Sequence, residues 1–385
     1  MVEELHHAKG TGVILSPRDL KYRLASDYAS RYRVLGAAIG IDLQFYNPAF
    51  TNRRLKTYPT DQFRMSVSEL RRIGDVDLAR FCESLEAVNR SVGSSVLIAP
   101  AVLYEAENPG IVDLNERLFV AARAVGNTLG IPTWATVFVG RSVAESDDLL
   151  SNVLSAVTSL NCDGWYFAFE FPEAERLPTS DSTVRRFAEA VLSLACTGSP
   201  VFHAYAGPMA ILSMAVGAAA AGVGHWQNLW HFHRTLWETA RDSQGGGGGA
   251  PPRYWARALW GTIIYPDETA RLDAATREAI LQPSPFSEQV AHGLAWDRWQ
   301  ACKHLVSVIC DEIEAMSGLP STRERLQHVK QLLEEAVARH AAIAAQGVTL
   351  KDSTSSYQSN WRKALEQVEA NRGRDLDYLM LLGGP

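Results

Sequence analysis

The sequence lacks the marks of secreted and membrane-spanning proteins. Its five cysteines are scattered without a CxxC pair, and the polar first nine residues have no secretion-signal pattern. We therefore expect reduced thiols in a cytoplasmic protein. The most apolar helical stretch, 209–223, is too short to span a bilayer, so we expect a soluble protein without membrane contact.

Several catalytic and binding signatures are absent as well. There is no Walker-type loop, no GxGxxG motif that opens a helix and no GxSxG turn, which argues against P-loop enzymes and serine-triad hydrolases. Positive charge is not in excess: the net charge is −6 and the isoelectric point is near 6.0. Net charge therefore gives no support to nucleic-acid binding, and we expect no bound cofactor.

What the sequence does contain is a regular alternation of short apolar runs and amphipathic stretches over much of its 385 residues. The expected strands are 12–15, 34–43, 95–103, 132–139, 164–171, 200–205, 222–227 and 255–264. The expected helices between and after them are 17–32, 67–89, 114–129, 144–160, 182–196, 208–219, 229–240 and 268–280. Eight β-then-α units favour a closed (β/α)8 barrel of the TIM type over residues 10–282.

Two segments interrupt this pattern, and a third region follows it. The loop 46–64 is long, and the run Gly245–Gly249 is either a mobile lid or a variable tether. Residues 283–385 read as a helical extension, with expected helices at 287–316, 322–346 and 359–371. These helices either pack on the barrel or form a partner surface, and a homo-oligomer through them is one such arrangement.

The carboxyl ends of the strands hold the expected active site, because the loops that follow parallel strands converge there in such barrels. Asp42 and Glu170 are the expected catalytic acid, base or nucleophile, with pKa values adjusted by burial. The expected substrate-binding residues, also at strand ends, are Gln44, Glu105, His203, Tyr205, His225, Trp226 and Gln227. The alternative is that each of these side chains only hydrogen-bonds a neighbouring loop.

The aromatic and histidine residues around 225–237 allow two further interpretations. Trp226 follows His225 at a strand end and is the best candidate to stack on a ring of the substrate. His225, His231 and His233 invite a metal site, but residues two apart on the expected helix 229–240 face different directions. We therefore assign no metal ligands.

Residues 200–208, Pro-Val-Phe-His-Ala-Tyr-Ala-Gly-Pro, and the Ala-Val-Gly-Ala stretch at 215–218 resemble the late barrel region of tRNA-guanine transglycosylases. The resemblance covers about thirty residues and implies a TIM barrel. The zinc-binding cysteines of that family are absent. Where its nucleophilic aspartate would follow the next strand, this chain has Gly224 and His225.

These patterns together predict an enzyme that acts at a glycosidic or N-glycosidic bond of a small, polar, ring-containing substrate such as a nucleoside. Asp42 and Glu170 would carry out the chemistry, and Trp226 or Tyr205 would stack on the ring. The alternative is a catalytically inactive barrel that serves as a protein-interaction or assembly module. That alternative requires an exposed apolar stripe on helix 322–346.

Overall fold

The fold is seen in a computed structural model that describes residues 2–108, 110–172, 175, 177–224, 229–238, 253–288, 296–351 and 353–382. Its strands are β1 (Val13–Leu15), β2 (Ile39–Ile41), β3 (Leu97–Ile98), β4 (Thr133–Val139), β5 (Gly164–Phe169), β6 (Val201–His203), β7 (Ala220–Ala221), β8 (Arg253–Ala256) and β9 (Gly261–Ile264). Strands β3 to β7 form one parallel sheet in sequence order, and β1 pairs with β2 in parallel. The Ser95 amide donates to the Ile39 carbonyl at 2.7 Å, which places β2 beside β3.

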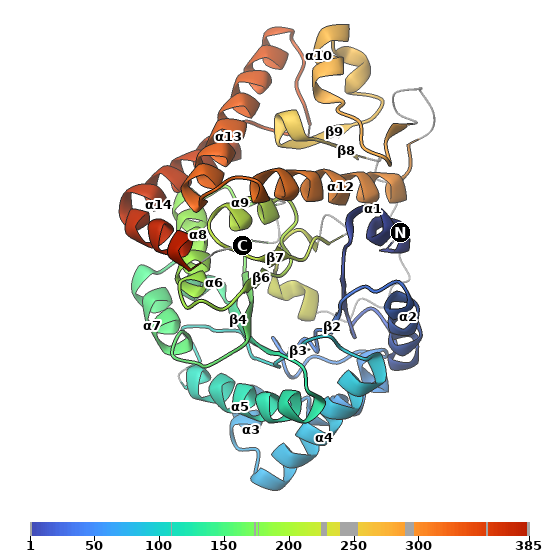
Figure 1. Cartoon of the computed structure of the whole chain (residues 1–385), viewed down its shortest axis with the longest axis vertical. Helices are drawn as coiled ribbons and strands as arrows, with labels where there is room; N and C mark the ends of the chain where they lie inside the picture. Colours follow the sequence, from blue (N-terminus) through green and yellow to red (C-terminus); the bar gives the residue numbers. More distant parts are fainter. Residues whose placement is uncertain are drawn as a thin grey trace.

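Helices cover the outer side of these strands (Figure 1). In the first part of the chain they are α1 (Val2–Lys9), α2 (Tyr22–Val34), α3 (Val67–Arg71), α4 (Asp75–Val92), α5 (Ile111–Leu129), α6 (Arg141–Ala144), α7 (Asp147–Val157), α8 (Asp181–Ala195) and α9 (Met209–Ala215). The C-terminal region holds α10 (Ala274–Ile280), α12 (Arg298–Ser317), α13 (Thr322–Ala345) and α14 (Ser356–Leu381). Short 3-10 turns are η1 (Leu55–Thr57), η2 (Pro59–Phe63), η4 (Arg234–Trp237), η5 (Arg257–Leu259) and η6 (Thr269–Arg271).

Most residues of the central sheet are buried on both faces, which explains why its strands are largely apolar. On β5, Trp165, Phe167 and Phe169 belong to the core shared with the outer helices. Tyr166 and Ala168, which alternate with them, belong to a second core on the concave side. Residues on this inner face point toward the space that the strands partly enclose, and there they meet the ends of other strands.

The α/β alternation is confirmed, but the prediction of a closed (β/α)8 barrel is wrong. The described residues form a five-stranded parallel sheet and a separate parallel pair, and β1 and β7 are not paired with each other. The segment 255–264 does not supply the eighth parallel strand. Its backbone folds back at η5, so β8 and β9 bond to each other in antiparallel orientation.

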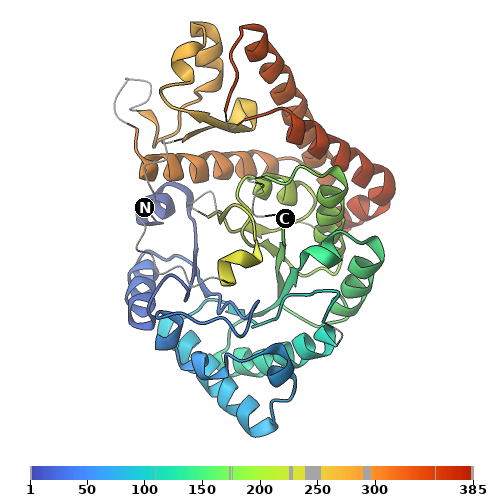
Figure 2. The same cartoon turned by 180° about the vertical axis from the view of Figure 1, so that it is seen from behind.

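The hairpin β8–β9 packs with the C-terminal helices (Figure 1). Tyr254, Leu259 and Ile263 share a small apolar core with Ile280 of α10 and Ile343 of α13. Helix α12 runs between this unit and the α/β body in both views (Figures 1 and 2). The hairpin and α10 precede Pro283, yet their packing partners follow it. The division at residue 283 remains a prediction.

The apolar stripe of α13 faces inward. Leu326, Val329 and Leu333 are fully buried, and α13 packs mainly on α14, which in turn packs on α8. The exposed stripe that an assembly module would require is therefore not present on this helix. Among the described residues, no helix combines the length and hydropathy needed to cross a bilayer.

Candidate functional site

Asp42 lies directly after β2 and faces the inner side of the strands. It is 4% exposed. Its Oδ2 accepts hydrogen bonds from the hydroxyls of Tyr46, Tyr166 at 3.1 Å and Tyr205 at 3.5 Å. Its Oδ1 accepts the Gln44 amide at 2.9 Å. One carboxyl group thus joins the end of β2 to β5 and to the turn after β6.

Burial dominates the chemistry of this carboxyl group. Desolvation raises the pKa of Asp42 to about 6, although the hydrogen bonds from Tyr46 and Gln44 oppose the shift. Burial and the neighbouring Asp42 charge raise the pKa of Tyr46, Tyr166 and Tyr205 well above their ordinary value. The three phenols therefore remain neutral donors, while Asp42 changes charge near neutral pH.

The backbone beside Asp42 is strained at two positions. Gln44 has φ 57° and Tyr205 has φ 53°, in the left-handed region that side chains other than glycine rarely adopt. The two residues are bonded to each other, since the Gln44 side-chain amide donates to the Tyr205 hydroxyl at 3.2 Å. Gln44 also binds the loop after β1 through the Ser16 hydroxyl and the Arg18 amide. Strain of this kind is concentrated at functional sites in proteins.

Arg64 holds the loop that carries Asp42 and Gln44. Its guanidinium donates to the carbonyls of Leu43 at 2.6 Å, Gln44 at 3.3 Å and Phe50 at 3.2 Å, and it lies 4.6 Å from the ring centre of Phe45. Desolvation lowers the pKa of Arg64 to about 10, so the group remains charged at neutral pH. Because this buried guanidinium donates hydrogen bonds to backbone carbonyls, it fixes the path of the chain from β2 into the loop.

An aromatic layer covers the Asp42 cluster. Trp237 of η4 lies edge-to-face against Tyr46 and Tyr205, with ring centres 5.3 and 5.7 Å apart, and stacks on Phe232. The yellow segment with η4 lies between the blue β1–β2 region and the green strands (Figure 2). Within the described part of the chain, the Trp237 indole N–H is buried without a hydrogen-bond partner. An unpaired buried donor costs about 1–3 kcal/mol.

Glu170, the second predicted catalytic carboxylate, follows β5 and is 6% exposed. The Arg234 guanidinium binds it through two contacts of 2.7 Å, and the backbone amides of Arg141 and Arg234 donate to it. Burial alone would raise the pKa of Glu170, but the hydrogen bonds from Arg234 and Arg141 outweigh it and lower the pKa below its ordinary value. Glu170 is therefore held in its ionised form.

Glu105 shares Arg234 with Glu170. It also accepts the Asn108 side-chain amide at 3.1 Å. Burial raises the pKa of Glu105 despite the ion pair with Arg234, and the nearby Glu170 charge adds to this shift. The ends of the chain segments after β3 and β5 are thus joined through one arginine.

Asp42 and Glu170 occupy the same inner side at different depths. Glu170 lies four residues beyond Tyr166 along β5, a rise of roughly 13 Å. None of the hydrogen bonds that the structure describes connects the two groups to a shared partner. The pKa values of the two carboxyl groups are shifted in opposite directions, and η4 lies between them and solvent.

His203 does not join this inner cluster. It sits on the outer face of β6, 2% exposed, with its ring 4.7 Å from that of Phe187 on α8. Its Nδ1 is 3.1 Å from the Ser213 hydroxyl, which itself donates to the Ala210 carbonyl. Desolvation lowers the pKa of His203 to about 3, so the ring is neutral. This position between sheet and helices is that of a structural histidine.

The remaining predicted residues divide into two groups. His225, Trp226 and Gln227 lie outside the described residues. His231 and His233 are buried with ring centres 5.2 Å apart, on a segment that is not the predicted helix 229–240 but a bridge at Phe232 followed by η4. Within the described ranges, no group of three or more His, Cys, Asp or Glu is placed to hold a metal ion.

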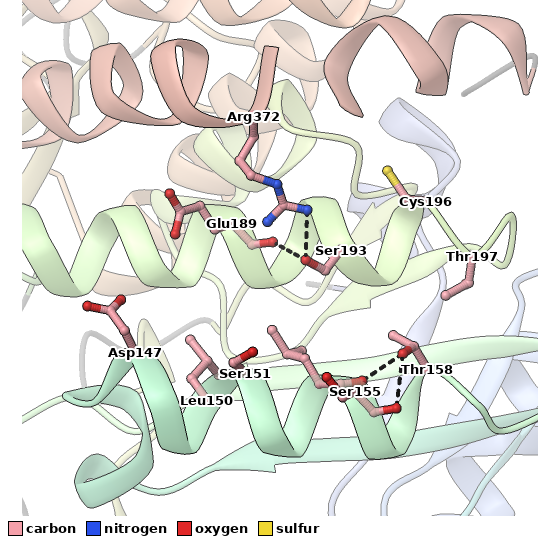
Figure 3. A pocket seen from close by; sticks show the side chains of 11 residues that line it. Asp147, Leu150, Ser151, Ser155, Thr158, Glu189, Ser193, Cys196, Thr197 and Arg372 are labelled. Carbon is pink, nitrogen blue, oxygen red and sulfur yellow. Dashed lines mark hydrogen bonds between the residues drawn. The ribbon is translucent and has the colours of Figure 1, made fainter. Parts of the chain in front are cut away.

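A groove of about 480 Å³ opens on the outer helical layer, between α7, α8 and α14 (Figure 3). Its charged groups already have partners: Asp147 binds Arg185 and Arg186, and Arg372 binds Ser193 and Asp375. Its residues come from helices, not from the strand ends. Burial and backbone strain coincide instead at Asp42, which is therefore the candidate site.

Sequence reasoning missed the residues that define this site chemically. Tyr46 and Trp237 lay in segments interpreted as a loop and a helix, and Arg234 and Arg64 were not singled out. Tyr166 could have been found, because it alternates with the outward Trp165 and Phe167 on β5 and must point inward. Comparison with protein-family models and with curated proteins finds no match to this chain.

Proposed function

We propose that this protein is an enzyme that cleaves a glycosidic or N-glycosidic bond of a polar, ring-containing substrate. The observation that carries the proposal is the pair of buried carboxyl groups whose pKa values are shifted in opposite directions. Asp42 has its pKa raised to about 6, whereas that of Glu170 is lowered. Environments that separate two carboxyl pKa values in this way assign one acid and one base.

The two groups have complementary roles in hydrolysis. Protonated Asp42 gives its proton to the leaving oxygen or nitrogen as the bond to the sugar carbon breaks. Ionised Glu170 takes a proton from the water whose oxygen adds to that carbon. Both carboxyl groups return to their starting states by exchanging protons with solvent, and no cofactor is consumed.

The neutral tyrosines beside Asp42 support the same chemistry. Tyr46, Tyr166 and Tyr205 donate to the Asp42 carboxylate that remains after proton transfer, which stabilises its charge in an apolar setting. The strained turns at Gln44 and Tyr205 fix these donors in place. Binding of substrate against aromatic faces is typical of ring-containing ligands.

The test is a panel of nucleosides and nitrophenyl glycosides, with release of base or nitrophenol as the readout. We expect Asp42→Asn and Glu170→Gln to abolish turnover while the far-ultraviolet circular dichroism spectrum stays that of the wild type. Glu107→Gln, an exposed carboxylate near the same strand ends, is the matched control and should retain activity. Unchanged turnover in both test variants would reject the assigned roles. A panel that yields neither turnover nor a shift in melting temperature would reject the substrate class.

A further inference from the structure

Residues 229–238, here called the η4 segment, lie across the strand ends, where the Asn47 side-chain amide donates to the Trp237 carbonyl at 3.1 Å. The backbone of Phe232 pairs with that of Glu170, and the Arg234 guanidinium binds Glu170 and Glu105. The Arg234 side chain is 37% exposed, so water competes for these ion pairs. The ion pairs of Arg234 are therefore the part of this attachment that is open to water.

The apolar side of the η4 segment fills the space over Asp42. The Trp237 indole is 1% exposed and lies between Tyr46, Tyr205 and the stacked Phe232. Its N–H has no hydrogen-bond partner in the described part of the chain, whereas water would supply one if the ring moved outward. The unpaired N–H thus offsets part of the apolar burial that keeps the segment closed.

We propose that the η4 segment is a lid, and that Trp237 occupies the position that a planar heteroaromatic ring of the substrate takes when the lid opens. This inference rests on the proposed function. It narrows the substrate class to N-glycosides with a flat base of about indole size. Opening uncovers Asp42 and breaks the Arg234 ion pair with Glu170. The substrate ring then covers Asp42 in place of Trp237, and the Arg141 amide remains as a donor to Glu170.

Ligand binding gives the first test. Because the lid is closed for most of the time, the apparent affinity of the wild type is the affinity of the open form multiplied by the fraction of molecules that are open. We expect Trp237→Ala to bind guanosine or inosine at least about tenfold more tightly than the wild type in isothermal titration calorimetry. Trp134→Ala is the matched control, because Trp134 lies half-buried at the amino end of the same inner face. Equal gains in both variants, or no gain in Trp237→Ala, would overturn the lid.

Hydrogen exchange of indole N–H groups gives a second test that needs no ligand. The Trp165 N–H, fully buried and bonded to Thr197 at 3.0 Å, is the internal reference. We expect the Trp237 proton, assigned by its loss in Trp237→Phe, to exchange faster than that of Trp165. Glu105→Gln should accelerate only the Trp237 proton, because it removes one of the two carboxylates that bind Arg234. Equal exchange rates at both indoles in both proteins would overturn the inference.

The two proposals fail separately. If Asp42→Asn abolishes turnover while Trp237→Ala gains no affinity, the chemistry stands and the lid is rejected. If Trp237→Ala gains affinity for purine nucleosides while Asp42→Asn keeps full turnover, the ring site stands and the catalytic assignment is rejected.

Discussion

Two opposing effects control the charge of Asp42. Burial favours the neutral acid, and four donors favour the carboxylate: three phenol hydroxyls and the Gln44 amide. Burial prevails, which raises the pKa of this side chain from 3.8 to about 6. A shift of this size corresponds to on the order of 3 kcal/mol between the two protonation states.

The shift predicts a specific pH dependence of stability. Below about pH 4, Asp42 is protonated in both the folded and the unfolded state. As the pH rises through about 6, the unfolded state has already released the proton, whereas the folded state must ionise a buried group, so stability falls. From pH 4 to pH 7, we expect the wild type to lose on the order of 3 kcal/mol relative to Asp42→Asn in urea denaturation. Parallel pH profiles for the two proteins would contradict this prediction.

At the scale of elements, the loop after β2 depends on Arg64, which closes it by binding three carbonyl groups. We expect Arg64→Met to lower the free energy of unfolding by about 2–4 kcal/mol, because those buried acceptors lose their donor. Arg64→Lys should restore only part of this free energy, since an ammonium group cannot reproduce the planar arrangement of donors on the guanidinium. The exposed Arg53→Met, in the same loop, should change stability by less than about 0.5 kcal/mol in the same denaturation experiment. Equal effects of the Arg64 and Arg53 variants would contradict this account.

Elements were predicted well where their own residues determine the secondary structure, and poorly where contacts with distant residues determine it. Strands β4 and β5 were predicted to within a few residues, because their β-branched and aromatic runs are buried on both faces. Segment 255–264 is also rich in apolar residues, but it forms a hairpin, because η5 and the left-handed Trp260 reverse the chain. Segment 229–240 looked amphipathic, yet tertiary contacts at Phe232 and Trp237 prevent a helix in its described part.

The candidate site shows the same division between local pattern and distant contact. Asp42 and Glu170 were predicted because charged residues at the ends of apolar strands are unusual. Their partners Tyr166 and Arg234 come from segments 124 and 64 residues away, and no local pattern indicates those pairings. His203 faces outward because of the order in which residues of β6 alternate between the two faces of the sheet. A strand of three residues is too short for sequence periodicity to predict that order.

At the scale of the whole molecule, the C-terminal helices complete the core of the α/β body. Helix α14 covers α8, and α13 covers α9. We expect a chain shortened to residues 1–320 to lose its cooperative unfolding transition in calorimetry, because apolar faces of α8 and α9 become exposed. The full chain is the control. A shortened chain that melts cooperatively at the same temperature would show that the two helices are an appendage.

The contact between α14 and the body also has a consequence for biosynthesis. The Trp361 indole donates to the Pro178 carbonyl, and these residues are 183 positions apart in the chain. After α8 (Asp181–Ala195) has left the ribosome, the chain must still be synthesised beyond Ser356 before the covering helix α14 can emerge. During that interval the apolar side of α8 is open to other chains, so we expect the nascent protein to depend on chaperones until translation is nearly finished.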